Sequence, residues 1–211
     1  MKQATIDPSA IFATTIYSTK KPEFLVDVTA VADKLLIDAK AARPMNGIYP
    51  FVMSDSMLGN ERTAAFEQFI SECAWAILDN QGYRMSDFTA YVSELWVQEH
   101  FKYSGMEQHV HPFGDVISGF YFLEVPQGSC LIEVHDPRPG KVQASLPFKS
   151  QTEVQMSSNA LQITPEPGLM ILTNSWLPHS LTRNSSDSPI KFVHFNVATR
   201  PTERKSGPII V

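Results

Sequence analysis

The chain has 211 residues, of which 43% are hydrophobic and 18% charged, and its formal net charge is −5. This length suits one domain with a sizeable core, and the composition excludes an intrinsically disordered chain. The acidic net charge argues against a nucleic-acid partner, since general nucleic-acid binders normally carry a basic surface. The apolar runs are too short to span a membrane and no secretion signal is visible, so we expect a cytoplasmic protein without membrane contact.

The first part of the chain has the spacing of helices. Residues 23–42 carry apolar side chains at close to helical intervals, which predicts one amphipathic helix. A second helix is expected to begin after Asn60, a good N-cap residue, and to end before Gly82. These helices predict a helical layer that precedes the rest of the fold.

From Phe88 onward the pattern changes to short segments rich in aromatic and β-branched residues, separated by Gly, Pro, Asn and Ser. Strands are predicted at residues 88–98, 105–111, 116–124, 129–134, 152–157, 160–164, 169–173, 178–182 and 190–198. Helices followed by many strands favour a mainly β fold of the α+β type, with a double-stranded β-helix (jelly-roll, cupin-like) core and helices packed outside it.

We expect a single domain that covers residues 1–211. Within it, residues 1–87 form an N-terminal strand and helices that pack on the core, residues 88–200 form the core, and residues 201–211 form a tail.

His109 and His111 are the first candidates for chemistry. Residues two apart in a strand point to the same face, so these imidazoles would lie side by side. Imidazole is a good ligand for iron, zinc, copper and nickel. Asp115 follows a Pro-Phe-Gly turn and could bend back as an oxygen ligand, whereas a pair of surface histidines on an edge strand is the plain alternative.

His179 strengthens the metal hypothesis. It follows a Trp-Leu-Pro corner after an apolar strand, and in a β-sandwich a late strand can lie beside an early one. His179 could therefore reach the His109 and His111 pair, although a hydrogen-bonded core histidine would be the default for this residue alone.

Several short segments in a fixed order make the chain resemble a known family. These segments are residues 11–17, 105–111 and 117–123, Asp136-Pro137-Arg138, Pro167-Gly168, residues 175–179 and Phe195-Asn196. The chain is similar to iron(II)/2-oxoglutarate oxygenases of the phage and marine-bacterial type, distant relatives of prolyl 4-hydroxylases. Residues 11–17 look like the opening strand of that family.

The resemblance implies an Fe(II) ion bound by two histidines and a carboxylate, with open positions for 2-oxoglutarate and O2. His109 matches the first histidine of the superfamily and His179 the last. The chain departs at the middle ligand, where His111 stands in place of an aspartate. Either His111 binds the metal, or Asp115 supplies the carboxylate, or both bind as in cupins; we favour three histidines with Asp115 nearby.

The resemblance also implies a cation for the distal carboxylate of 2-oxoglutarate, on the strand that follows the last histidine. Lys191 is the nearest match and Arg183 the second. Close relatives carry an arginine at the position that is Ile190 here, so a β-bulge would have to bring Lys191 into place.

Further contacts are assigned to five residues: Ser118, Tyr121 and Asn196 to the co-substrate, Arg138 and Trp176 to the substrate. His194 is expected to make a structural hydrogen bond. The expected function is hydroxylase-type oxidation of a small molecule or peptide, with 2-oxoglutarate converted to succinate and CO2. The alternatives are a cupin-like metalloenzyme that does not use 2-oxoglutarate and a non-catalytic jelly-roll binding module.

Overall fold

The computed structural model describes residues 7, 9, 11–111, 114–140, 146–150 and 152–202. The helical elements are η1 (Pro22–Phe24), α1 (Leu25–Ala42), η2 (Glu61–Thr63), α2 (Ala64–Asn80) and η3 (Met85–Asp87). The strands are β1 (Tyr17–Lys20), β2 (Phe51–Met53), β3 (Phe88–His100), β4 (Met106–His109), β5 (Asp115–Glu124), β6 (Ile132–His135), β7 (Ala160–Ile163), β8 (Leu169–Asn174), β9 (His179–Leu181) and β10 (Ile190–Pro201).

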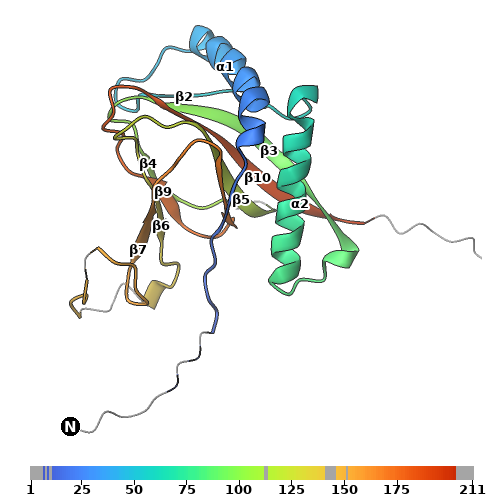
Figure 1. Cartoon of the computed structure of the whole chain (residues 1–211), viewed down its shortest axis with the longest axis vertical. Coiled ribbons are helices and arrows are strands. Elements are labelled where there is room, and N and C mark those ends of the chain that lie inside the picture. The colour runs from blue at the N-terminus through green and yellow to red at the C-terminus, as the bar shows by residue number, and fades with distance from the viewer. Residues whose placement is uncertain are drawn as a thin grey trace, which may run out of the picture.

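The strands form two antiparallel sheets. The main sheet has the order β1-β8-β5-β10-β3-β2 and the minor sheet the order β4-β9-β6-β7. From β3 to β10 the chain passes through main, minor, main, minor, minor, main, minor and main sheet in turn. Alternation of this kind between two facing sheets confirms the predicted double-stranded β-helix. Figure 1 shows the minor-sheet strands on one side of the main sheet and the two long helices on the other.

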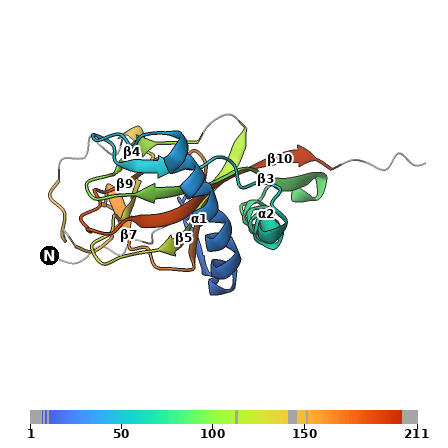
Figure 2. The same ribbon diagram turned by 90° about the horizontal axis from the view of Figure 1, so that it is seen from above.

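The helices cover the outer face of the main sheet. Val28, Val31 and Leu36 of α1 recur at helical spacing and are buried, as are Phe66 and Ile70 of α2. As predicted from sequence, Asn60 caps the second helical segment, where its side chain accepts a hydrogen bond from the backbone N–H at position 62. Figure 2 shows β3 and β10 continuing together past the other strands, alongside α2.

Strands β5 and β10 lie in the middle of the main sheet and are buried on both faces, which explains their nearly continuous apolar sequences. Their odd-numbered residues, such as Val193 and Phe195, belong to the core beneath the helices. Their even-numbered residues, such as Phe120 and Phe192, belong to the core between the two sheets. The alternation therefore decides which side chains can reach a site inside the jelly roll.

Two predictions about strands are wrong. Residues 152–157 form no strand: Val154 and Met156 are exposed, and the Ser150 hydroxyl accepts hydrogen bonds from the backbone N–H groups of Thr152 and Glu153, which favours a turn. The opening strand starts only at Tyr17. Phe12 before it is 96% exposed and has a positive φ of 58°, which is incompatible with an extended strand.

The sequence analysis also missed the short strand β2, which pairs with the end of β3. Most of the predicted tail, residues 203–211, lies outside the described residues. None of the described helices combines the length and the apolar character needed to cross a membrane.

Candidate metal centre

Two adjacent strands of the minor sheet bring three histidines together. His109 at the end of β4 is the register partner of His179 at the start of β9. His111 lies two residues beyond His109, and its backbone N–H donates a 2.9 Å hydrogen bond to the carbonyl of Ser175, which precedes β9. One possible ligand atom from each of the three histidines lies within 4.8 Å of the others. The local fold thus presents three imidazoles to one point.

Backbone carbonyls orient two of these rings. His109 Nδ1 lies 2.8 Å from the carbonyl oxygen of Glu107, and His179 Nδ1 lies 3.0 Å from that of Leu177. A carbonyl can only accept, so each Nδ1 must carry the proton and each Nε2 is left with a free lone pair. Metal-binding histidines are commonly held by such contacts, which fix the tautomer and the direction of the ring.

The third ring completes the arrangement. His111 Nε2 lies 3.3 Å from His179 Nε2, and the two rings are stacked with an interplanar angle of 9°. This spacing suits two nitrogens that share one ion, because metal–imidazole distances are about 2.1 Å. Burial lowers the pKa of both His111 and His179 to about 4, with a smaller effect from the neighbouring imidazoles. Both rings are therefore neutral at pH 7, the state that binds metal.

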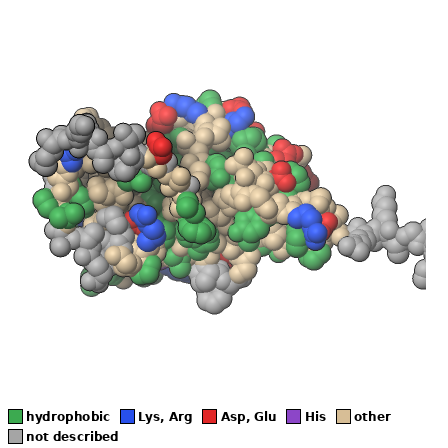
Figure 3. All heavy atoms as spheres, turned by 90° about the horizontal axis from the view of Figure 1, so that it is seen from below, with side chains coloured by type: hydrophobic (Ala, Val, Ile, Leu, Met, Phe, Trp, Pro, Cys, Tyr) green, Lys and Arg blue, Asp and Glu red, His purple; other side chains and the backbone are tan. Residues whose placement is uncertain are grey.

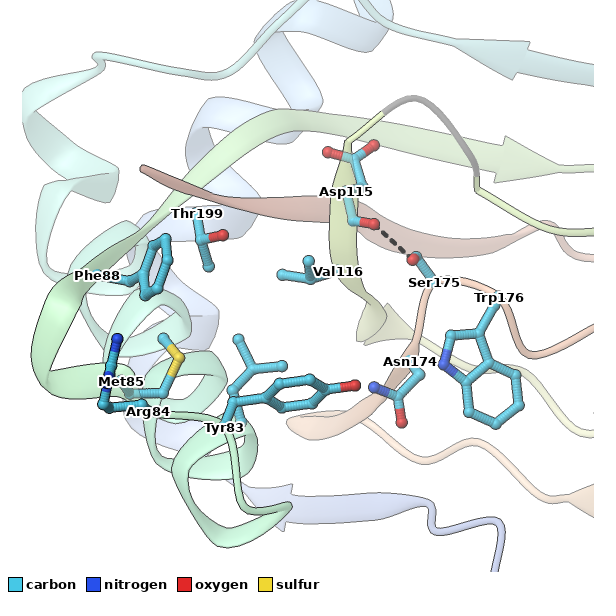
Figure 4. Close-up of a pocket in the computed structure, with 11 residues that line it drawn as sticks. Tyr83, Arg84, Met85, Phe88, Asp115, Val116, Asn174, Ser175, Trp176 and Thr199 are labelled. Carbon is cyan, nitrogen blue, oxygen red and sulfur yellow. Dashed lines mark hydrogen bonds between the residues drawn. The ribbon is translucent and has the colours of Figure 1, made fainter. Parts of the chain in front are cut away.

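Asp115 does not join the three histidines. Its carboxylate accepts a 2.6 Å hydrogen bond from the Ser93 hydroxyl on β3, and its backbone carbonyl accepts another from the Ser175 hydroxyl. Burial raises the pKa of the Asp115 carboxyl, although the Ser93 hydrogen bond opposes this effect. In Figure 4 the Asp115 carboxylate points away from the neighbouring cavity, while its carbonyl faces Ser175. The donor set that the structure presents is three imidazoles.

A wall of rings from the main sheet closes the inner side of the centre. Phe120 meets His179 edge to face at 5.5 Å between centroids, and His194 packs against His111 at 4.7 Å. His194 is fully buried and stacks on Trp96, yet neither of its ring nitrogens has a hydrogen-bond partner among the described residues. The expected structural hydrogen bond of His194 is thus absent. Its neighbours are the proposed metal ligands instead.

The residues predicted to bind the co-substrate fall into two groups. Ser118 and Asn196 are register partners on β5 and β10, and their even positions place them on the inner face with His194. Lys191 and Tyr121 have odd positions and point to the helices: Lys191 forms ion pairs with Asp33 and Glu124. The Tyr121 hydroxyl donates to a backbone carbonyl next to η1.

Arg183 is directed to the surface beyond β9. Its side chain is 58% exposed, contacts Glu107 at 3.6 Å and donates to the Tyr103 carbonyl. The structure therefore brings neither Lys191 nor Arg183 to the histidines. The register shift beside Lys191 does not rescue it, because the extra residue lies in β5 and leaves the alternation along β10 unchanged.

The two predicted substrate residues lie near the ends of the strands that carry the histidines. Trp176 is half exposed and lines a cavity of about 290 Å³ together with Tyr83, Phe88 and Val116. Figure 4 shows Trp176 at the rim of this cavity, beside Asn174. Arg138 is exposed and pairs with Asp136 at 2.6 Å, in the loop after β6.

Sequence reasoning gave Trp96 only as a core or pocket-wall residue and His194 only as a structural hydrogen-bonding group, and assigned neither a role in the site. A signal was available for both, because they stand at matching inward positions of neighbouring strands as register partners. Their significance appears only when β3 and β10 are placed beside the histidines of the minor sheet.

The family described as "Putative 2OG-Fe(II) oxygenase" matches residues 94–196, a segment that begins in β3, ends in β10 and contains all three histidines. No curated protein matches the chain.

Solved structures of the same fold come from several 2-oxoglutarate oxygenases. The epimerase SnoN from nogalamycin biosynthesis is 15% identical, with a TM-score of 0.64 over 91% of this chain and 81% of its own. The Pseudomonas putida prolyl-4-hydroxylase is 11% identical, with a TM-score of 0.59 over 88% and 93%. The Trichoplax adhaerens prolyl hydroxylase, solved with a peptide fragment, is 12% identical, with a TM-score of 0.54 over 86% and 82%.

At these identities the structural likeness establishes the fold, and the family model matches residues 94–196, just under half of the chain. With its double-stranded β-helix and its three convergent histidines, this part of the chain is similar to the 2OG-Fe(II) oxygenases.

Proposed function

We propose that His109, His111 and His179 bind the catalytic Fe(II). The observation that carries this proposal is the convergence of one ligand atom from each residue within 4.8 Å. The two carbonyl contacts of His109 and His179 leave their Nε2 lone pairs free, and the lowered pKa of His111 keeps its ring neutral. Imidazole suits iron, so the donor set fits the family's metal.

Fe(II) and 2-oxoglutarate supply the activation of O2, with release of succinate and CO2 and oxidation of the substrate. The chain contributes a rigid set of three ligands, held in position by β4, β9 and two backbone carbonyls. Phe120 and His194 close the inner side of the centre, which limits the access of water.

We place the co-substrate against the inner face of the main sheet. Ser118 and Asn196 support this position, since both are buried there on neighbouring strands. Lys191, Arg183 and Tyr121 have other partners and point elsewhere, so we do not assign them to co-substrate binding.

The substrate side is the open edge where His109 and His111 are only partly buried. We propose a small-molecule or peptide substrate with an apolar or aromatic group that enters the cavity beside Trp176. Ser175 lines this cavity, and its carbonyl accepts a hydrogen bond from the backbone N–H of His111. The backbone N–H of His135 donates a hydrogen bond to the carbonyl of Pro178, just before His179. This contact holds the loop that carries Arg138 near the metal centre. We propose that Arg138 contacts an acidic group of the bound substrate.

No nucleic-acid partner is proposed. The net charge is −5, and Figure 3 shows acidic and basic side chains mixed on one face without a continuous basic patch there. The free thiols of Cys73 and Cys130 agree with a reducing cytoplasm, which we propose as the location of the enzyme.

The metal proposal is tested by metal content. His109→Ala, His111→Ala and His179→Ala should each lower Fe(II) affinity by orders of magnitude, because each removes one of three ligands. Elemental analysis and equilibrium titration under anaerobic conditions measure this loss on protein shown to be folded by circular dichroism. His135→Ala is the matched control, because His135 bonds to Ser180 and is no member of the cluster. Wild-type stoichiometry in all three variants would refute the site.

The use of 2-oxoglutarate is tested by spectroscopy. Anaerobic addition of Fe(II) and 2-oxoglutarate to the wild-type protein should give the weak visible charge-transfer band of the chelate. Iron binding without this band, and without succinate after O2 is admitted, would favour the metalloenzyme that does not use 2-oxoglutarate.

A further inference from the structure

Among the described residues, the inward positions of β3, β10, β5 and β8 in the main sheet carry no lysine or arginine. Its inward residues on four neighbouring strands are Glu94, Trp96, Gln98 and His100 of β3, Ile190, Phe192, His194 and Asn196 of β10, Ser118, Phe120 and Phe122 of β5, and Leu169, Ile171 and Thr173 of β8. The one carboxylate among them, Glu94, accepts a 2.6 Å hydrogen bond from the amide of Asn196. None of these described side chains on the four strands is a lysine or arginine that could pair with a second negative charge.

Four buried polar groups on the same face are nonetheless without partners among the described residues, and three of them can donate. The possible donors are the Trp96 Nε1, the Ser118 hydroxyl and the ring of His194; the fourth group is the side-chain oxygen of Asn196, an acceptor. Ser118 and His194 are both fully buried. An unsatisfied buried polar atom destabilises a fold, so such groups side by side indicate that they face a ligand.

These three groups lie next to one another and next to the metal ligands. Trp96 and His194 are register partners whose rings stack at 4.6 Å. Ser118 is one inward position away, opposite Asn196. His194 packs against His111, so a molecule bound at the metal would reach these groups directly.

Each of the three can donate a hydrogen bond without carrying a charge. The indole N–H is a donor only, the hydroxyl rotates to suit, and a neutral imidazole has one N–H in either tautomer. Asn196 is different, because its side-chain amide already donates a hydrogen bond to the Glu94 carboxylate. The three groups together are polar but uncharged.

We propose that Trp96, Ser118 and His194 form a charge-neutral pocket for the far end of the 2-oxo acid, so that this enzyme accepts 2-oxo acids with an uncharged far end nearly as well as 2-oxoglutarate. The proposal rests on the metal centre proposed above. A buried cation would enforce a carboxylate, because an uncharged end would leave that cation unpaired. Neutral donors lose far less, since water or a weaker acceptor can satisfy them.

The decisive measurement uses the wild-type protein loaded with Mn(II) under anaerobic conditions. Metal binding is first followed by calorimetry, and 2-oxoglutarate and 2-oxopentanoate are then titrated separately. The second compound has a methyl group in place of the far carboxylate. The two dissociation constants should agree within about tenfold, whereas a cation anchor predicts a gap of roughly a hundredfold or more.

Variants locate the pocket. His194→Phe, which keeps the ring, and Ser118→Ala should each weaken 2-oxoglutarate by about five- to tenfold, because its far carboxylate loses a donor. Both variants should leave 2-oxopentanoate nearly unchanged, because its far methyl group accepts no hydrogen bond. His135→Phe, Lys191→Met and Arg183→Met should leave both constants unchanged, because these side chains have partners elsewhere.

A hundredfold preference for 2-oxoglutarate, or selective weakening of 2-oxoglutarate by Lys191→Met or Arg183→Met, overturns the neutral pocket. Mn(II) binding without binding of either 2-oxo acid also overturns it and leaves the metal centre standing. Failure of Mn(II) to bind at the histidines refutes the metal centre itself, and the pocket with it.

Discussion

At the scale of single residues, the site depends on what each histidine touches. His109 and His179 each donate Nδ1–H to a backbone carbonyl, and His194 has no such partner among the described residues. His100 is also buried, but its two nitrogens lie 2.7 Å from Ser104 and 2.8 Å from Gln98. The same residue type is therefore found as a proposed metal ligand, as a ring packed against the proposed ligands and as a structural hydrogen-bonding group.

A first prediction compares His111 with Asp115. His111→Ala should lower metal affinity by roughly two orders of magnitude, because it removes a ligand. Asp115→Ala should leave metal affinity within a few fold, because its carboxylate bonds to Ser93 and not to the metal. Parallel Fe(II) titrations measure both. Loss of binding only in Asp115→Ala would restore the carboxylate as the middle ligand and make His111 a neighbour of the centre.

A second prediction concerns pH. Burial lowers the pKa of His100 to about 4, below the ordinary value near 6.5. Between about pH 6.5 and pH 4, His100 is protonated in the unfolded chain but neutral in the folded chain. The free energy of unfolding therefore falls as the pH drops through this range. The contribution of His100 over this window is on the order of 2–3 kcal/mol.

Urea unfolding of wild type and His100→Gln between pH 7 and about pH 4.5 measures this effect. Both proteins are studied without metal, so that proton competition at the centre does not contribute. The variant should be less stable at neutral pH but lose stability less steeply on acidification. Parallel curves for the two proteins would assign the acid sensitivity to other groups.

At the scale of elements, the tight packing of β5 on its neighbours positions the inner face. Gly119 of β5 lies under the Phe195 ring, and a Cβ placed there would be 2.4 Å from that ring and from the Ile171 carbonyl. This close packing fixes the position of β5 between its neighbours. Ser118 and Phe120, on either side of Gly119, therefore point into the jelly roll beside the histidines.

A third prediction follows for Gly119→Ala. The added methyl group cannot be accommodated without moving β5 from β8 or β10, and overpacking of a core costs about 1–3 kcal/mol. Thermal unfolding should show a lower Tm than wild type, and the affinity for 2-oxoglutarate should fall with it. Gly140→Ala is the matched control, because none of the residues that the structure describes lies within 4 Å of a Cβ there. An unchanged Tm for Gly119→Ala would contradict this packing.

Much of the secondary structure could be predicted from the sequence. Strand and helix periods located both long helices and most strands to within a few residues, and the spacing of His109, His111 and His179 predicted their convergence. The period of a strand also separates Lys191 from His194, which are three residues apart and so face opposite ways. The pattern could not predict the register of β3 against β10, which makes Trp96 the partner of His194.

At the scale of the whole molecule, the two sheets have unequal support. The main sheet is covered by α1 and α2 on one face and by the minor sheet on the other. The minor sheet has four short strands and contributes two of the three histidines from β4 and β9. The register of such a long-range pair cannot be inferred from local sequence, because four other strands separate β4 from β9 along the chain.

The position of β4 has a consequence for how the protein opens. It is the edge strand of the minor sheet and is in register with β9 only at Met106 and His109, with an irregularity between them. Amide protons of such a strand exchange with solvent through local opening events far cheaper than global unfolding. A metal ion held by both strands would have to dissociate before each opening, so exchange in β4 should slow by about a hundredfold at a metal concentration one hundred times the Kd. Exchange in the middle of β10 should not respond, and equal slowing in both strands would show that β4 opens only when the entire jelly roll does.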